Sequence, residues 1–131
     1  MTRVLVDTSI WVDFFKGNEV AQPLFELLDA GNVVTNDLIL TELLPSIRKR
    51  RELELEGLLL SIEKIPMAVE WNELAAMQLV NLASGNNNMG IPDLMILQNA
   101  IQNKLVLFEN DKHFQLAEKT FGVRLYGGKR E

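Results

Sequence analysis

The stretch RVLVDTSIWVDFF, residues 3–15, decides the fold of this chain. Residues 3–6 form a largely apolar run typical of a strand, and the residues that follow predict a helix that opens near Ser9 and ends at Gly17. Asp7 interrupts the apolar run, and two hydroxyl residues stand directly behind it. An acid at this position either caps the helix or lies at the mouth of a site, and the stretch alone supports both interpretations.

The length and composition predict one compact domain. The chain has 131 residues, 47% of them hydrophobic, which is enough for a sizeable core. We place the domain at residues 1–126, followed by a flexible tail at 127–131. The N-terminus does not resemble a signal peptide, and the apolar runs are far shorter than the ~20 residues that span a bilayer. We therefore expect a cytoplasmic protein that has no membrane partner.

The residue types limit the possible chemistry. The sequence contains no cysteine, and its single histidine is His113. Disulfides, thiolate nucleophiles and sulfur-ligated zinc are therefore excluded. A Ser-His-Asp triad would need His113, but no Gly-x-Ser-x-Gly motif accompanies it, so we expect a surface or capping histidine. Catalysis would then fall to carboxylates, hydroxyls, amides and bound ions.

The charge of the chain argues mildly against a nucleic-acid-binding protein with a broad basic surface. The net charge is −5, but an acidic active site would account for most of the excess, and bound divalent cations would cancel it locally. The densest basic run is RKRR, residues 48–51. It is either a solvated helix face or a surface for RNA phosphates or an acidic partner segment.

Short β-rich runs alternate with helical stretches along the chain. Strands are expected at residues 3–6, 32–35, 64–67, 105–108 and 123–126. Further helices are expected at residues 20–30, 36–47 with a kink or an end at Pro45, 52–62, 69–83, 92–103 and 111–121. This alternation predicts an α/β fold, in which a mainly parallel sheet of four to five strands lies between two layers of helices.

Two sets of apolar residues have helical spacing. Residues 69–83 predict an amphipathic helix, with apolar positions at Trp71, Leu74, Ala75, Leu79 and Leu82. Trp11, Phe14 and Phe15 follow the first strand at helical spacing and predict a core or an interface.

Two acids follow strands directly. Asp7 comes after the first strand, and Asp111 follows residues 105–108 with only Glu109 and Asn110 between. Ligands of parallel α/β sheets bind beyond the carboxyl ends of the strands. We therefore expect Asp7 and Asp111 to project at the same edge of the sheet.

Two more acids occupy unusual positions on helices. Glu42, in LILTELLPSI, borders an apolar stripe, so we expect partial burial, and a desolvated carboxylate raises its pKa or acquires a cation. Asp93, in GIPDLMILQNA, falls in the first turn of its helix, where the helix dipole favours an acid. Each of these acids also has an ordinary explanation as a cap or a solvated side chain, but their joint placement predicts one acidic pocket.

Such a pocket offers hard oxygen ligands. These suit Mg²⁺ or Mn²⁺ with several waters retained, and these ions usually serve phosphate chemistry. The predicted metal ligands and catalytic residues are Asp7, Glu42, Asp93 and Asp111. The hydroxyls of Thr8 and Ser9 are candidate contacts for a phosphate or a metal-bound water, and they are equally suited to cap the helix.

Four segments in chain order resemble the PIN-domain nucleases, and among these the VapC-type toxins of prokaryotic toxin–antitoxin pairs. The segments are VLVDTSIWVDFF, LILTELL, GIPDLMILQNAI and LFENDKHF, and the resemblance covers essentially the whole chain. It implies a PIN-like α/β/α fold and a metal-dependent endoribonuclease that cleaves single-stranded or looped RNA. It also implies a homodimer and inhibition by a cognate small antitoxin. A groove lined by Trp11, Phe14 and Phe15, in which an amphipathic antitoxin segment would dock, is the alternative to a core or interface role for these three residues.

The resemblance assigns the acidic quartet to Asp7, Glu42, Asp93 and Asp111, with Ser9 at the position of the family's usual hydroxyl residue. The chain departs from the family pattern at Glu109, where Thr or Ser is common, and at His113, where a second Asp is frequent. An acid at position 109 would alter the hydrogen bonding of the pocket or add a charge to it.

Other functions fit less well. An aspartyl-nucleophile phosphatase would need a second acid where Ser9 stands, and a phospho-receiver domain would need an acceptor Asp that KIPMAVE, residues 64–70, does not supply. The alternative that stays open is a degenerate PIN domain that binds RNA or a protein partner without cleavage.

Overall fold

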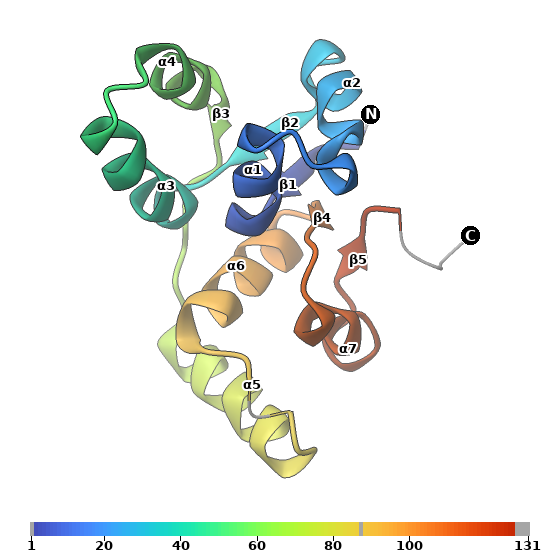
Figure 1. Cartoon of the computed structure of the whole chain (residues 1–131). Coiled ribbons are helices and arrows are strands. Elements are labelled where there is room, and N and C mark those ends of the chain that lie inside the picture. The colour runs from blue at the N-terminus through green and yellow to red at the C-terminus, as the bar shows by residue number, and fades with distance from the viewer. Residues whose placement is uncertain (1, 87, 128–131) are drawn as a thin grey trace.

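The computed structural model describes residues 2–86 and 88–127, apart from the side chain of His113. Its sheet has five strands: β1 (Val4–Val6), β2 (Val33–Thr35), β3 (Glu63–Lys64), β4 (Val106–Phe108) and β5 (Arg124–Leu125). All neighbouring strands are parallel, in the order β3-β2-β1-β4-β5 (Figure 1). The predicted α/β fold with a parallel sheet is confirmed. Of the predicted tail, 127–131, only Gly127 lies within the described residues.

Helices connect the strands in every crossover. They are α1 (Thr8–Phe15), α2 (Pro23–Asp29), α3 (Asp37–Lys49), α4 (Leu53–Ser61), α5 (Trp71–Ala83), α6 (Ile91–Gln102) and α7 (Lys112–Phe121). The helix expected at 20–30 is divided, because a short 3-10 helix, η1 (Glu19–Ala21), precedes α2. Pro23 begins α2, which suits proline because the first helical residue needs no N–H partner. None of the described helices is both long and apolar enough to span a bilayer.

The three central strands are buried along their whole length. Leu5 of β1 pairs in register with Leu107 of β4, and both are 0% exposed. Strands that are buried on both faces need helices on both sides, as Figure 1 shows. Because the strands are parallel, their carboxyl ends meet at one edge of the sheet. Asp7 follows β1 at this edge, Asn36 follows β2, and Glu109 follows β4.

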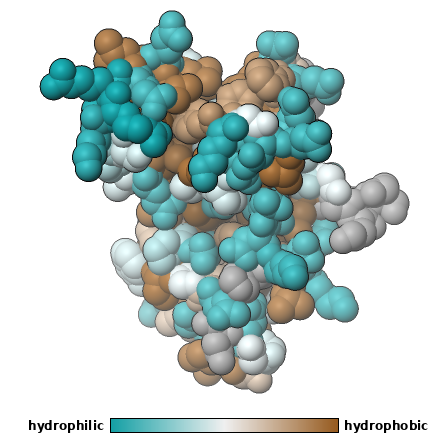
Figure 2. Space-filling model, viewed as in Figure 1, coloured by the Kyte–Doolittle hydropathy of each residue, from teal (hydrophilic) through white to brown (hydrophobic). Residues whose placement is uncertain are grey.

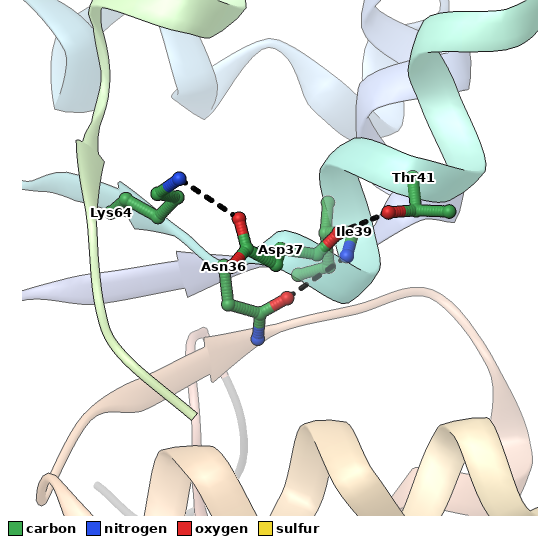
Figure 3. A network of polar contacts seen from close by, with 5 residues as sticks. All are labelled: Asn36, Asp37, Ile39, Thr41 and Lys64. Atoms are coloured by element: carbon green, nitrogen blue, oxygen red, sulfur yellow. Dashed lines mark hydrogen bonds and ion pairs between the residues drawn. The ribbon is translucent and has the colours of Figure 1, made fainter. Parts of the chain in front are cut away.

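The start of α3 is anchored by a polar network (Figure 3). The buried Asn36 accepts a 2.9 Å hydrogen bond from the N–H of Ile39, and the Asp37 carboxylate pairs with Lys64 of β3 at 2.9 Å. The hydroxyl of Thr41 donates a 2.7 Å hydrogen bond to the backbone oxygen of Asp37. This network fixes the first turns of α3, from which Glu42 projects.

A second buried contact ties α3 to α6. The amide of Asn36 donates a 2.9 Å hydrogen bond to Oδ1 of Asn99, and the amide of Asn99 donates at 3.0 Å to the backbone oxygen of Pro66. Both side chains are nearly inaccessible to solvent, so removing either one would leave the amide of the other buried without its hydrogen bond. The network holds α3 and α6, which carry Glu42 and Asp93, in a fixed relation.

Pro45 does not end α3, contrary to one of the two outcomes predicted for it. The helix continues to Lys49, and Pro45 lies on its exposed side. Leu43, Leu44 and Ile47 are buried in the core on either side of the proline. The burial of these side chains offsets the loss of one backbone hydrogen bond, so tertiary packing overrides the local preference.

The helix predicted at residues 69–83 is present as α5, but residues 2–86 and 88–127 leave most of its predicted apolar stripe uncovered. Leu74 is buried, whereas Trp71, Leu79 and Leu82 are 66%, 67% and 58% exposed. Figure 1 shows α5 lying along α6 and away from the sheet, and Figure 2 shows apolar side chains at that end of the molecule. The sheet and the other helices therefore leave an apolar face of α5 open.

Candidate active site

Asp7 both caps α1 and lies at the edge of the sheet, so the two interpretations of this acid hold together. Its Oδ2 accepts a 2.9 Å hydrogen bond from the hydroxyl of Ser9 and a 3.4 Å bond from the Ser9 N–H. Its own N–H donates to the backbone oxygen of Phe108 at 2.9 Å, which ties it to the end of β4. The side chain is only 7% exposed, so the capping carboxylate is largely shielded from solvent.

Asp93 lies close enough to Asp7 for their charges to interact. Burial raises the pKa of Asp7, hydrogen bonds from Ser9 and Thr8 oppose the rise, and the charge of Asp93 adds to it. Asp93 stands in the first turn of α6, as predicted, and its Oδ2 accepts a 3.2 Å hydrogen bond from the Gly90 N–H. The fold therefore brings two acids that are far apart in sequence to one place.

Glu109 joins the same group of acids. The pKa of Glu109 is raised to about 7, mainly by burial and also by the charges of Asp7, Asp111 and Glu118. The hydrogen bond from the Asp111 N–H opposes this rise. Asp111 is half-buried. The expectation that Asp7 and Asp111 project at the same edge of the sheet is therefore supported through Glu109, which interacts with both.

Glu109 was not among the residues predicted for the site. The sequence offered two signals: the residue directly follows a buried strand, and it replaces the hydroxyl residue that the resemblance leads one to expect. Both signals identify position 109 as unusual, but neither reveals that its carboxylate folds back onto the chain.

Glu42 is connected to the acids at the sheet edge by Thr8, the residue next to Asp7. The hydroxyl of Thr8 donates a 2.6 Å hydrogen bond to Oε1 of Glu42. The predicted partial burial of Glu42 is wrong, because Leu40 and Leu43 fill the core while Glu42 faces solvent. The hydroxyls of Thr8 and Ser9 therefore each hold one acid, Glu42 and Asp7 respectively.

The donor set suits a hard cation, but not a cage of four carboxylates. Among residues 2–86 and 88–127, no three Asp, Glu or His side chains are placed to bind one ion. Mg²⁺ commonly uses one or two carboxylates and keeps its waters, and a cation would relieve the repulsion between Asp7 and Asp93. The residues present therefore fit a water-rich site at Asp7 and Asp93, while Glu42 is exposed and Asp111 half-buried.

A cavity of about 410 Å³ adjoins this group of acids. It lies between α1 and α3 and shares Thr8 and Glu42 with the site. Its apolar lining includes Val12, Phe15 and Ile47. A molecule bound in this cavity would therefore reach the acids at the sheet edge.

Comparison with known proteins agrees with this architecture. The family model described as PIN domain matches residues 4–119. No curated protein matches the chain significantly in sequence. Three solved structures share the fold over 95% of this chain. One is DNA-bound VapBC from Salmonella typhimurium, with 20% sequence identity, 97% of that chain covered and a TM-score of 0.69. Another is VapBC2 from Rickettsia felis bound to a DNA fragment from its promoter, with 21% identity, 97% of that chain covered and a TM-score of 0.70. The third is FitAcB from Neisseria gonorrhoeae, with 18% identity, 96% of that chain covered and a TM-score of 0.71. Because the family model matches most of the length of this chain, we conclude that the chain belongs to the PIN domain family.

Proposed function

We propose that this protein is a metal-dependent endoribonuclease and the toxin of a toxin–antitoxin pair. PIN domains are generally nucleases. The observation that carries the proposal is that Asp93 lies near enough for its charge to raise the pKa of the buried Asp7, at the carboxyl end of the central strand. Two acids held in such proximity, in a fold of nucleases, support a cation site for phosphodiester hydrolysis.

Each residue has a separate role in the proposed reaction. Asp7 and Asp93 would hold Mg²⁺ or Mn²⁺, which when bound neutralises a phosphate oxygen and acidifies water. Ser9 keeps the Asp7 carboxylate oriented, and Thr8 does the same for Glu42. Asp111 and Glu42 would accept hydrogen bonds from waters at the rim of the site and complete the catalytic quartet.

The proposed substrate is single-stranded or looped RNA. Part of the basic run at 48–51 is internally neutralised, because Arg48 pairs with Glu56 and Arg50 with Glu52, each within 2.7 Å. Lys49 is exposed and remains a candidate contact for RNA phosphates. Lys16 and Arg50 line the cavity beside Thr8 and Glu42, and a bound metal would add to their attraction for the RNA backbone.

A small antitoxin is the proposed protein partner. The similar structures from Salmonella typhimurium and Rickettsia felis are VapBC complexes, and a similar structure from Klebsiella pneumoniae is a toxin–antitoxin complex with a TM-score of 0.66. Trp11 is fully buried, whereas Phe15 is half-buried and lines the cavity of about 410 Å³. An amphipathic antitoxin segment seated there would cover Thr8 and Glu42 and so block access of RNA.

A homodimer is the proposed assembly, and the cytoplasm is the proposed location. The open apolar face of α5 supports the dimer, because Trp71, Leu79 and Leu82 would be removed from water by a second copy. An RNA substrate places the activity in the cytoplasm.

One observation favours a second candidate function. The described residues hold no group of three ligands ready for one ion. A degenerate PIN domain that binds RNA or its partner without cleavage would show the same feature.

Cleavage assays on the purified chain distinguish the two functions. We expect cleavage of single-stranded RNA with Mg²⁺ or Mn²⁺, none with EDTA, and loss of activity in Asp7→Asn and Asp93→Asn with the fold retained by circular dichroism. Asp29→Asn, which changes an exposed acid at the end of α2, is the matched control and should cleave normally. Cleavage that survives EDTA or both site substitutions would refute the nuclease mechanism. RNA binding without cleavage under any metal would establish the degenerate domain.

A further inference from the structure

Glu109 is the first residue after β4. It directly follows Phe108, whose backbone oxygen accepts the 2.9 Å hydrogen bond from the N–H of Asp7. The end of β4 and the first residue of the candidate site are therefore in direct contact. The segment of residues 109–111 then leads from β4 into α7, and it carries Asp111.

The side chain of Glu109 turns back onto this segment. Its Oε1 accepts a 2.6 Å hydrogen bond from the N–H of Asp111, two residues further on. The backbone oxygen of Asp111 in turn accepts a 3.1 Å bond from the N–H of Phe114 in the first turn of α7. Both backbone groups of Asp111 are therefore held, one by Glu109 and one by the helix.

Stability alone does not account for an acid at position 109. The carboxylate is desolvated, and the charges of Asp7, Asp111 and Glu118 all oppose its ionisation. A hydroxyl side chain can also accept the N–H of the second following residue, in a Ser/Thr turn, more weakly but without these costs. The feature that distinguishes position 109 is therefore the geometry of its acceptor, which reaches the N–H of Asp111 at 2.6 Å.

We propose that Glu109 is a positioning residue for the RNA cleavage: its carboxylate oxygen holds the N–H of Asp111 and thereby fixes the position of Asp111 at the end of β4. This inference rests on the proposed function. Glu109 acts through its acceptor oxygen and not through its charge, so glutamine fulfils the role and alanine does not. A direct metal ligand would show the opposite dependence on charge.

The experiment compares four substitutions in the full chain: Glu109→Gln, Glu109→Ser, Glu109→Ala and, as a control, Glu54→Ala on the exposed face of α4. We measure kcat and KM for single-stranded RNA at saturating Mn²⁺, and the hydrogen exchange rate of the Asp111 amide. We expect Glu109→Ala to lose about 10- to 100-fold in kcat with little change in KM, because misplaced catalytic groups cost rates of that order. Glu109→Gln should stay within about threefold of the unmodified protein, and Glu109→Ser should recover most of the loss.

The amide exchange separates positioning from a merely structural role. Protection of the Asp111 amide should fall in Glu109→Ala and persist in Glu109→Gln, while Glu54→Ala changes neither readout. Full activity of Glu109→Ala overturns the proposal, and so does inactivity of Glu109→Gln, which would assign the role to the charge.

The results also separate failure of the Glu109 proposal from failure of the proposed nuclease function. If Asp7→Asn is inactive while Glu109→Ala remains active, only the role of Glu109 is refuted. If neither the unmodified protein nor any variant cleaves RNA with any metal, the nuclease function is refuted and the positioning role of Glu109 is refuted with it.

Discussion

The hydroxyl of Thr8 and the carboxylate of Glu42, which are 34 positions apart in sequence, form a 2.6 Å hydrogen bond. Through this bond the residue after Asp7 holds an acid that projects from α3. Glu42 is exposed to solvent, so the hydroxyl of Thr8 is the group that orients its carboxylate. The bond therefore links the centre of the candidate site to its outer rim.

We predict that Thr8→Val lowers the rate of RNA cleavage by about tenfold, because a single charge-assisted hydrogen bond that orients Glu42 is lost. The free energy of unfolding should change by less than about 1 kcal/mol, since the bond is exposed to solvent. Cleavage kinetics and urea unfolding measure the two effects. Thr8→Ser retains the hydroxyl and should behave like the unmodified chain. Equal activity of the Val and Ser variants would contradict an orienting role.

Asp7→Asn should abolish activity while increasing stability at neutral pH. Cleavage should fall on the order of 10³-fold, as for other essential carboxylates. The folded pKa of Asp7 is raised, so its ionisation costs stability, and the unmodified chain loses stability as pH rises from the ordinary Asp range through the folded value. Urea unfolding in EDTA between pH 3 and 8 measures this loss. A variant that is less stable than the unmodified chain at pH 8 would show that the carboxylate is stabilising instead.

Glu109→Gln should also raise the free energy of unfolding at pH 8 in EDTA. Between the ordinary value of 4.5 and the folded pKa of about 7, ionisation of Glu109 increasingly disfavours the folded state. The upper limit of the gain is about 3.5 kcal/mol, since one pKa unit corresponds to about 1.4 kcal/mol, and solvent screening of the partly exposed carboxylate reduces it. Below pH 4 the two chains should be equally stable. The same difference at pH 4 and pH 8 would exclude ionisation as the cause.

Metal binding should stabilise the unmodified chain and not its site variants. A cation at 100 times its Kd adds about 2.7 kcal/mol to the free energy of unfolding. Thermal unfolding with and without Mn²⁺ measures the shift in Tm, which should disappear in Asp7→Asn and Asp93→Asn. The control Asp29→Asn should retain it. A shift of equal size in all four proteins would place the bound metal elsewhere.

Leu79→Lys should convert the proposed dimer into a folded monomer. Leu79 is 67% exposed on α5, so a charge there leaves the core intact but prevents burial of the apolar face against a second copy. Light scattering coupled to size exclusion gives the mass, and circular dichroism checks the fold. Gln115→Lys, an exposed substitution on α7, is the control. A monomeric unmodified chain would show that α5 does not mediate a dimer.

The order of the elements could be predicted from the sequence, because alternating strand and helix patterns allow few connections other than parallel crossovers. RVLVDTSIWVDFF placed Asp7 directly after a strand, and GIPDLM placed Asp93 in a first helical turn, as the structure has them. These features depend on neighbours in the chain, so local patterns suffice to predict them.

The features that could not be predicted depend on distant parts of the chain. Glu42 is exposed and not partly buried, and Pro45 stays inside α3 because the core holds Leu44 and Ile47. The apolar stripe of α5 stays open because no element among the described residues covers it. The sequence pattern shows that a side chain is apolar, but not what covers it.

The local sequence determined which acids follow strands and which open helices, because those positions are set by hydrogen bonding within a few residues. Only the tertiary structure decided that Asp93 comes to lie beside Asp7, that Thr8 holds Glu42, and that Glu109 belongs to the same group. The reason is that charge interactions and desolvation depend on distances in space, and the packing of helices on the sheet sets these distances.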